Sequence, residues 1–371
     1  PASGEIDAAL GVMADIESDH QILTAKLAKA EADWIPVRSG REIERYKHIR
    51  QAEVDLKKYL PEAAAKKTKA EADQKARLAA AQKAITDFDA TVPAKLAAWE
   101  KTLTLANFWS PWNLLTPATA EADKKSEMKL TTEADGSILA SGAPKAVVYT
   151  VTIPVKAAGQ ISGLMIEALT DERLPGYGPG LNVNGNFVVS EFDVDFVPTG
   201  GDPKKPSVVN FVDAKVDHIQ QGFDVKKTFD GKSDRSVQGW GIGGNERKPN
   251  WARYQLDKPL AIDEKGGTLT VKIHCQYNGG EYPLGKFRLW STSSPTPLEL
   301  GLPKDVATVL QVAPAVRSKE QQALLTSFFQ NRDKDRHGLV FAALNEKKPL
   351  PADGQLLALE AALKTASDPI R

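Results

Sequence analysis

Between Ser137 and about Ser291 the sequence consists of short runs of β character, separated by glycine, proline and asparagine. Residues within a run alternate, so that Phe187, Val189 and Glu191 of "NFVVSEF" share one face of the expected strand. No helical pattern of about ten or more residues lies between the runs, which disfavours parallel βαβ units. We therefore expect an antiparallel β-sandwich. Its expected strands lie in "SILASG", "AVVYTVTIPV", "SGLMIEAL", "NFVVSEFDVDFVP", "SVVNFVDAKVDHI", "WARYQL", "TLTVKIHCQY" and "KFRLWSTS".

The first hundred residues follow a different pattern, in which apolar residues recur at a seven-residue spacing. This spacing predicts a coiled-coil seam. The seam consists of Ile6, Met13, His20, Leu27 and Trp34, interleaved with Ala9, Ile16, Leu23 and Ala30. The segment "IPVRSGRE" contains proline and glycine, and we expect it to end this first helix.

Two further helices are expected before residue 104. One covers Arg41 to Leu60, and Pro61 opens the other, which continues to about Leu103. Pro93 should kink that helix, because proline lacks the amide hydrogen that the helix needs. The seven-residue spacing continues there through Leu78, Ile85, Val92 and Trp99. Short connections favour antiparallel packing of the three helices.

Helices return after "SSPTPLELGLP". They are expected at residues 304–312, 318–330, 336–345 and 353–366, where Ser318 with Gln321, and Asp353, are typical helix starts. The predicted fold class is a multidomain α+β protein, with an antiparallel jelly-roll sandwich between two helical segments. The predicted domains are a helical coiled-coil region at 1–104, the sandwich at 105–300, and C-terminal helices at 301–371 that pack on the N-terminal helices.

Composition limits the classes of partner. With 371 residues the chain is long enough for two or three domains. Its 48 basic and 48 acidic side chains give no net charge, which disfavours nucleic acid and anionic membranes as partners. The sequence has no apolar run long enough to span a bilayer, and "PASGEIDAAL" lacks the features of a signal peptide. The single cysteine, Cys275, excludes an internal disulfide and is expected to be buried in a strand.

The stretch "LPGYGPGLNVNGNF", from Leu174 to Phe187, combines glycine, proline and asparagine. Its glycines superficially suggest a phosphate-binding loop. Such a loop must open a helix whose amides hold the phosphate, whereas here a strand follows. We therefore expect a long loop that leads into a strand.

Signatures of catalysis are weak. The five histidines have no metal-ligand spacing, there is no GxSxG motif, and Cys275 has no evident partner. We therefore predict that the chain is not an enzyme. A glycosidase-like pair of carboxylates stays open as an alternative, because four acidic residues flank the glycine-rich loop: Glu167, Asp171, Glu191 and Asp193.

Oxygen-rich side chains around the loop suggest a calcium site. Asp171, Asn184, Asn186 and Glu191 carry oxygen atoms of the kind that calcium prefers, and Asp230 in "TFDGKSDRS" is a second candidate. We expect Asp171, Asn186, Glu191 and Asp230 to be the metal ligands. The alternative is that the asparagines only form turns.

Aromatic residues beside glycine, proline or asparagine suggest a surface on which sugar rings could stack. Tyr177 and Trp240 are the main candidates for ligand binding, and Asn184 and Trp112 are added to them. Trp112 has an alternative role, since "FWSPW" could join the helices to the sandwich. Trp251 and Trp290 are expected in the core.

Several ordered phrases resemble the large multidomain c-type cytochrome proteins of planctomycete bacteria. They are "DGSILASG", "YTVTIPV", "IEALTDERLPGYGPGLNVNGNFVVSEFDV", "AKVDHIQQGFDV", "FDGKSDRSVQGWGI" and "LGKFRLWST". The resemblance covers most of Trp99 to about Ile370. It implies a segment of a larger periplasmic, secreted or envelope protein that has other domains as partners. Because the chain contains no Cys-x-x-Cys-His motif, no haem is expected in it.

The phrase "DAKVDHIQQGFDVKKTFDGKSDRSVQGW" also resembles a discoidin or galactose-binding-like jelly roll. That resemblance implies glycan binding beside a structural calcium near Asp230, with Trp240 at the sugar. The expected function is therefore a non-catalytic polysaccharide-binding module. The alternative is a structural module that docks other proteins through its helices.

Overall fold

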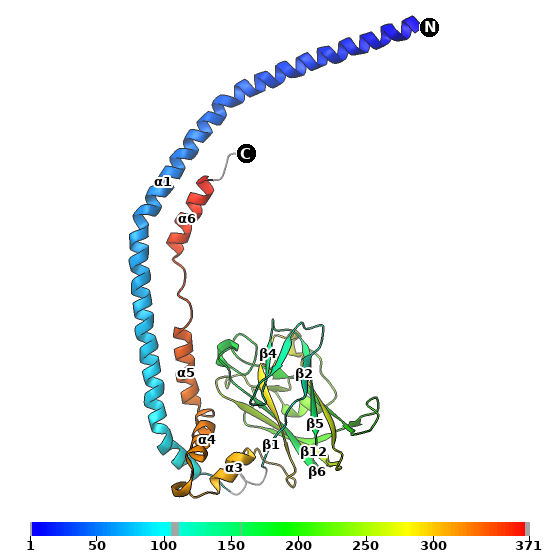
Figure 1. Ribbon diagram of the computed structural model, residues 1–371, viewed down its shortest axis with the longest axis vertical. Coiled ribbons are helices and arrows are strands. Elements are labelled where there is room, and N and C mark those ends of the chain that lie inside the picture. The colour runs from blue at the N-terminus through cyan, green and yellow to red at the C-terminus, as the bar shows by residue number, and fades with distance from the viewer. Residues whose placement is uncertain (1, 105–110, 157, 368–371) are drawn as a thin grey trace. The chain divides into compact units, whose positions relative to one another are not determined.

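The computed structural model describes residues 2–104, 111–156 and 158–367. These residues form two compact units, one up to Ala76 together with the chain from Lys348 onwards, and one from Arg77 to Lys347. The units cut across the segments 1–104, 105–300 and 301–371 expected from the sequence. The predicted fold class is confirmed, because a long N-terminal helix and a C-terminal helical segment flank antiparallel sheets (Figure 1).

A single helix, α1 (Ala2–Glu100), occupies the positions where three helices were expected. The predicted break at "IPVRSGRE" and the antiparallel packing of three N-terminal helices are therefore wrong. Pro36, Pro61 and Pro93 all lie inside α1. Contacts flank two of these prolines, since Tyr59 and Ala63 are buried on either side of Pro61, and Val92 and Leu96 on either side of Pro93. These buried contacts stabilise the helix at Pro61 and Pro93, where each proline removes one backbone hydrogen bond.

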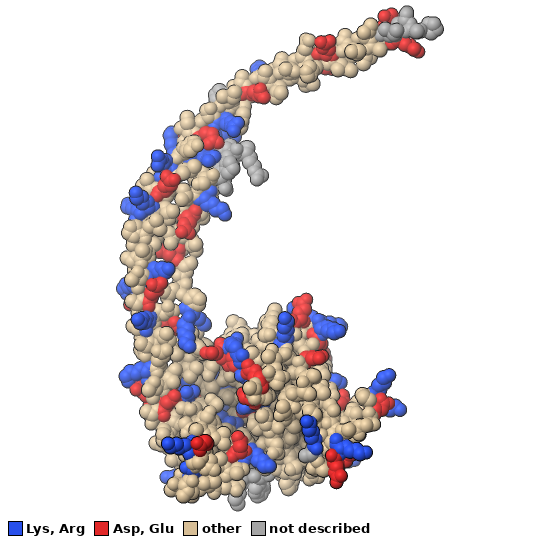
Figure 2. Space-filling model, viewed as in Figure 1, with Lys and Arg blue, Asp and Glu red and all other residues tan. Residues whose placement is uncertain are grey.

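The predicted seam in the first part of α1 is exposed. We define the apolar stripe as five side chains of this seam, Met13, Ile16, Leu23, Leu27 and Trp34, together with Val37, which continues the spacing; all six are 41–65% exposed. The side chain of Ile6, the first residue of the expected seam, lies outside the described part of the chain. On the face in view in Figure 2 this end of the helix carries few charged side chains.

In the same unit, α6 (Gly354–Ser367) follows the predicted helix start at Asp353. The Asp353 carboxylate accepts hydrogen bonds from the backbone amides of Gln355 and Leu356, which caps the helix. It also accepts a 2.8 Å hydrogen bond from the hydroxyl of Tyr59 on α1. The side chain of Gln74 donates to the carbonyl of Lys348 at 2.7 Å. Contact to α6 is thus made by the later part of α1.

The other unit contains the sandwich, and its strands pair antiparallel throughout the described part of the sheets. The larger sheet has the order β10 (Phe211–Val216), β12 (Asn250–Ile262), β6 (Gly159–Ala168), β14 (Lys286–Thr292), β4 (Ile138–Ser141), β3 (Lys129–Thr132), and β1 (Asn113–Leu114) pairs with β14. The second has the order β2 (Thr119–Ala122), β5 (Val147–Val155), β13 (Gly267–Cys275), β8 (Glu191–Pro198), β9 (Ser207–Val208). A short pair joins β7 (Val188–Val189) to β11 (Trp240–Gly241).

The sandwich core lies between the two sheets. Strands β5 and β13 alternate between buried and partly exposed residues, as the sequence pattern predicted. The core contains large aromatic side chains, and Cys275 is buried in it as expected. Tyr149 stacks on Phe287 with ring centroids 5.9 Å apart. In β6 alternate residues face two ways, because Leu164 and Ile166 enter the core while Met165 belongs to a second cluster on the outer face.

That outer cluster contains Trp112, Trp290 and Leu298 as well as Met165. The C-terminal helices of this unit are α3 (Lys304–Leu310), α4 (Lys319–Gln330) and α5 (Lys334–Glu346), close to their predicted ranges. The capping box expected of Ser318 and Gln321 is present at the start of α4. Short 3₁₀ turns occur at Pro175–Tyr177, Val225–Phe229, Tyr277–Gly279 and Pro314–Val316.

Helices α4 and α5 pack beside the last turns of α1 (Figure 1). Leu96 of α1 shares a small core with Leu325 and Phe328. The order of the ion pairs shows that the C-terminal helices run antiparallel to α1. The pairs are Arg317 with Glu100 at 2.7 Å, Arg336 with Asp89 at 2.7 Å, and Arg77 with Glu346 at 2.9 Å.

The glycine-rich stretch folds back on itself before β7, as the sequence indicated. A Cβ atom on Gly178 would lie 2.4 Å from the Cα of Gly185, and one on Gly180 would lie 2.0 Å from the carbonyl oxygen of Asn186. The Gly180 amide donates to the Gly185 carbonyl at 2.9 Å. Glycine is needed here because the two backbone segments touch.

Candidate functional site

The candidate site lies on the outer face of the larger sheet. In β14 the residues Phe287 and Leu289 enter the sandwich core, so the alternation of a strand directs the residues before, between and after them outward. These outward residues are Lys286, Arg288 and Trp290. The same alternation in β6 places Glu167 on this face, directly opposite Arg288 in the strand register.

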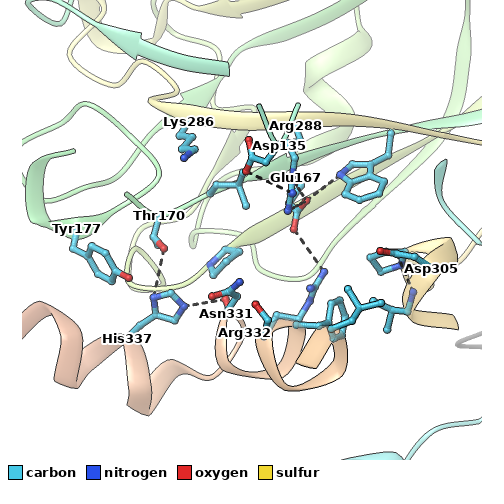
Figure 3. Close-up of a pocket in the computed structure, with 18 residues that line it drawn as sticks. Asp135, Glu167, Thr170, Tyr177, Lys286, Arg288, Asp305, Asn331, Arg332 and His337 are labelled. Carbon is cyan, nitrogen blue, oxygen red and sulfur yellow. Dashed lines mark hydrogen bonds and ion pairs between the residues drawn. The ribbon is translucent and has the colours of Figure 1, made fainter. Parts of the chain in front are cut away.

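Glu167 is the centre of the charge arrangement and is only 2% exposed. Its Oε2 accepts hydrogen bonds from Nε of Arg288 and from Nε1 of Trp290, both at 3.0 Å. Its Oε1 lies 3.7 Å from Nη2 of Arg332. A carboxylate removed from water needs such partners, and here two cations and an indole supply them (Figure 3).

Arg332 reaches the sheet from the turn between α4 and α5. Its guanidinium lies between two aromatic rings, 4.1 Å from the centroid of Trp251 and 3.7 Å from that of Phe328. Burial lowers the pKa of Arg332 to about 10, against the opposing effect of the Glu167 carboxylate. The side chain therefore remains a cation at neutral pH.

His337 on α5 forms the opposite side of the site and is 3% exposed. Its Nε2 lies 2.9 Å from the carbonyl oxygen of Asn331, so this nitrogen must carry the proton and donate it. Its Nδ1 lies 3.4 Å from the hydroxyl of Thr170 and can accept from it. Burial lowers the pKa of His337, which favours this neutral tautomer. The ring of Tyr177 packs on the imidazole at a centroid distance of 5.5 Å.

Together these groups line a cavity of about 370 Å³ between the sheet and helices α3, α4 and α5 (Figure 3). Its wall combines Tyr177, Arg288, Arg332 and His337 with Asp305 at the other end. A cavity of this size, with a few polar groups and aromatic faces, suits a small polar ligand. Opposite charges in the wall already pair with each other, so the wall does not select strongly for an anion or a cation.

A second ion-pair network fixes Lys286 at the edge of the cavity. Its Nζ lies 2.6 Å from Glu133 and 2.9 Å from Asp171, and Arg173 contacts both carboxylates. Burial alone would raise the pKa of Asp171, but hydrogen bonds from Arg173 and Lys286 hold it well below its ordinary value. Asp171 is therefore ionised and held by two cations.

The four residues predicted to bind a ligand do not lie in one groove. Tyr177 lines the cavity just described, while Asn184 lines a separate cavity of about 300 Å³ beside Arg247 and Lys334. Trp240 and Trp112 are 0% exposed, so neither can offer a ring face to a sugar. Trp240 instead packs edge-on against Phe187 at 4.9 Å. The placement of these two tryptophans at a binding surface is therefore wrong.

The burial of Trp240 has a local cause. Glycine flanks it on both sides, and a Cβ atom on Gly239 would lie 2.2 Å from the carbonyl oxygen of Val189. These glycines allow β11 to approach β7 closely, which carries the indole into the core. Trp112 is buried in the outer cluster with Trp290, and residues 108–110 of "FWSPW", which was expected to join the helices to the sandwich, lie outside the described part of the chain. Trp290 is buried as expected, and Trp251 partly so.

Two of the four predicted metal ligands already have other partners. Asp171 is held by Arg173 and Lys286, and Oδ1 of Asn186 accepts from the amides of Phe187 and Ile242 at 2.8 and 3.2 Å. Neither arrangement fits a calcium ligand, because the oxygens face hydrogen-bond donors. Among the described residues, no group of three or more His, Cys, Asp or Glu side chains is placed to hold a metal ion.

The other two predicted metal ligands, Glu191 and Asp230, are neighbours. Oε1 of Glu191 accepts from the amide of Gly231 at 3.0 Å, while its buried Oε2 has no hydrogen-bond partner among the described residues. The pKa of Glu191 is raised to about 7, mainly by burial and also by the charges of Asp193 and Asp230, against the lowering effect of the Gly231 hydrogen bond. An orphaned oxygen beside a second carboxylate fits two ligands of a cation site, and calcium takes six to eight.

The acidic residues proposed as an alternative glycosidase pair are divided between the sheets. Glu167 lines the cavity and is held by Arg288, while Asp171 contacts Lys286 at the edge of the cavity. Glu191 and Asp193 lie on β8 in the other sheet, and Asp193 contacts Nε2 of His274 at 2.9 Å.

Four charged or titratable side chains of the cavity were not expected from the sequence. Lys286 and Arg288 could have been found, because "KFRLWST" alternates polar residues with Phe287 and Leu289. The other two, Arg332 and His337, come from the α4–α5 region, and no periodicity in the sequence relates them to the sheet.

Comparison with protein-family models finds no match for this chain, and comparison with curated proteins finds no significant relative. Within the described residues, none of the helices combines the length and apolar character needed to cross a bilayer.

Proposed function

We propose that this protein is an assembly module that binds another polypeptide chain through α1. The observation that supports this proposal most directly is the apolar stripe, whose large side chains are 41–65% exposed at heptad spacing. Burying a large apolar side chain contributes about 1.5–3 kcal/mol, and isolated helices are marginally stable in water. A helix that presents such a stripe gains most from packing against a second helix.

The first test is the effect of charge on the stripe. We expect the wild-type chain to associate, and the variant with Leu23→Asp and Leu27→Asp to sediment as a monomer of 40.2 kDa. The reason is that both leucines lie in the expected interface, where an unpaired carboxylate is costly. Sedimentation velocity at several concentrations measures the effect.

A matched control adds the same charges to the opposite side of the helix. Ala25 and Ala32 are exposed and lie outside the seven-residue seam, so Ala25→Asp with Ala32→Asp should leave association unchanged. A wild-type chain that stays monomeric at every concentration would contradict the assembly proposal. Equal loss of association in both variants would place the contact elsewhere.

A second candidate function is weak binding of a glycan or similar polar ligand, and the cavity beside Tyr177 favours it. Tyrosine supplies a ring face, while Asn331 and the arginines supply hydrogen-bond donors. A shallow site of this kind is expected to bind in the range of about micromolar to millimolar. This candidate is non-catalytic, and the resemblance to planctomycete cytochrome proteins would place it in the periplasm or cell envelope.

Retention on polysaccharide affinity gels tests the second candidate. Replacing Tyr177 by alanine should abolish retention, because the ring contacts His337 and lines the cavity. Tyr46 is 61% exposed on α1 and serves as the control, so Tyr46→Ala should be retained like the wild type. No retention of the wild-type chain on any polysaccharide would count against glycan binding without affecting the assembly proposal.

A further inference from the structure

We propose that the apolar stripe pairs with the same stripe of a second copy of this chain, in parallel and in register, as a two-stranded coiled coil. This inference rests on the proposed assembly function and names its partner. In heptad notation, Met13, His20, Leu27 and Trp34 occupy a positions, and Ile16, Leu23, Ala30 and Val37 occupy d positions. These positions cover about three and a half heptads, which is enough for a coiled coil.

The stripe has a defined end. The next a and d positions are Arg41 and Glu44, and both are charged. Near this end the large Trp34 follows Ala30, so a small side chain in the preceding layer leaves room for the indole. His20 places one polar residue among the a positions, a device that favours pairing of identical layers in a coiled coil.

Charges beside the stripe identify the partner. Lys26 and Asp33 occupy g positions, and Glu31 and Arg38 occupy e positions. All four side chains are exposed, and none forms an ion pair with another described residue of the chain. In a parallel coiled coil, a g residue faces the e residue five positions later on the other helix. Lys26 then faces Glu31 of the partner subunit, and Asp33 faces Arg38 of the partner subunit.

Both contacts join opposite charges, and the two-fold symmetry of a dimer repeats each one. Parallel pairing therefore places these four charged side chains in attractive contacts, while the other two charges at e and g positions, Glu17 and Asp19, face Val12 and Thr24 of the partner subunit. Such complementarity would not be needed if the stripe bound an apolar surface of another kind. It is the feature that favours a second copy of the chain.

Antiparallel pairing of two copies uses the same charges poorly in the register that places Met13 opposite Ala30 of the partner subunit. When a layers face d layers, with His20 opposite Leu23 of the partner subunit, g positions face g positions and e positions face e positions. Lys26 then faces Asp19 of the partner subunit, but Asp33 faces the apolar Val12 and Glu31 faces the apolar Leu10. In this register three of the four charges lose their partners, whereas the parallel in-register arrangement pairs all four.

Cysteine cross-linking of the full chain tests the direction of pairing. Met13→Cys and Ala30→Cys place thiols at opposite ends of the stripe, and the native Cys275 is 1% exposed and does not interfere. Parallel pairing brings each new thiol next to its own counterpart, so each variant alone should form a disulfide-linked dimer on mild oxidation. Ala25→Cys, on the opposite side of the helix, is the matched control and should stay uncross-linked.

Charge reversal tests the register. Lys26→Glu and Glu31→Lys should each weaken dimerisation by about tenfold, because each converts two attractive contacts into repulsive ones. Combining both substitutions restores opposite charges and should return the dissociation constant to within about twofold of wild type. The antiparallel register with His20 opposite Leu23 of the partner subunit predicts instead that Lys26→Glu is rescued by Asp19→Lys.

The outcomes separate this inference from the proposed function. If the stripe variant abolishes association, but only a mixture of Met13→Cys and Ala30→Cys cross-links, the assembly function stands and the parallel arrangement is overturned. Absence of rescue by the double charge reversal overturns the register. A wild-type chain that is monomeric overturns both the pairing and the assembly function.

Discussion

Replacing Glu167 by alanine should lower the free energy of unfolding of the sandwich unit by about 3–5 kcal/mol, the usual cost of breaking a buried ion pair. The carboxylate is 2% exposed and holds Arg288 and the indole of Trp290. Without it, Arg288 and Arg332 remain close together with no negative charge between them, and the charge of Arg288 already disfavours the charged form of Arg332. Urea denaturation followed by tryptophan fluorescence measures the effect, because buried tryptophans lie in this unit.

A pair of milder substitutions separates charge from packing. Glu167→Gln keeps the shape of the side chain but removes the charge, and most of the destabilisation should remain. Asp135 also faces Arg288, at 3.9 Å, but its side chain is 52% exposed. Asp135→Asn should therefore cost less than about 1 kcal/mol, as exposed ion pairs generally do. Equal effects of the two neutralised carboxylates would show that Glu167 is not the centre of the charge arrangement.

The strands and the C-terminal helices could be predicted from the sequence because their signals are local. Alternation in "TLTVKIHC" and the serine and glutamine of "SKEQ" specify a strand and a capping box through residues two to four positions apart. Continuity of α1 could not be predicted in the same way. A proline disfavours a helix locally, whereas the buried contacts of Tyr59 and Leu96 that stabilise α1 come from residues far along the chain.

Proline at position 36 has no such explanation. The nearby side chains of Trp34 and Val37 are exposed, and among the described residues no buried contact accounts for the unbroken helix there. A second helix along the apolar stripe would supply one. The same stripe was predicted from the sequence as a seam, but the sequence placed its partner in the next segment of the same chain.

The cavity was only partly predictable, because its two walls are distant in sequence. Tyr177 was singled out for its glycine-rich surroundings, and it does line the cavity. Trp240 was singled out for the same reason and is buried, since glycines permit either an exposed loop or the close approach of two strands. Composition alone does not distinguish an exposed loop from closely packed strands. The two differ in how near the glycine lies to another backbone segment, as Gly239 does to Val189.

Stability should also fall as the pH rises from about 4.5 to about 7, because of Glu191. Burial raises the pKa of this carboxyl to about 7, so in this range the folded protein binds a proton that the unfolded chain releases. Raising the pH therefore favours unfolding, by about 2–3 kcal/mol once Glu191 is fully ionised in the folded state. Glu191→Gln removes this titration, so at pH 8 the variant should be more stable than the wild type, with little difference at pH 4.5. Urea denaturation of both proteins across this pH range measures the difference between their free energies of unfolding. The contributions of other titrating groups cancel in that difference, because both proteins contain them.

Adding calcium tests whether the Glu191 carboxylate is a metal ligand. If Oε2 of Glu191 and the neighbouring Asp230 hold the predicted ion, calcium at pH 8 should stabilise the wild-type protein and leave Glu191→Gln unchanged, because the ion replaces the missing partner of a buried charge. Glu264, an exposed carboxylate in the turn between β12 and β13, gives the control, and Glu264→Gln should follow the wild type in both pH dependence and calcium response. Parallel pH curves for the wild type and Glu191→Gln would mean that the buried oxygen is already satisfied in solution. A calcium effect that survives in Glu191→Gln would assign the ion to another part of the chain.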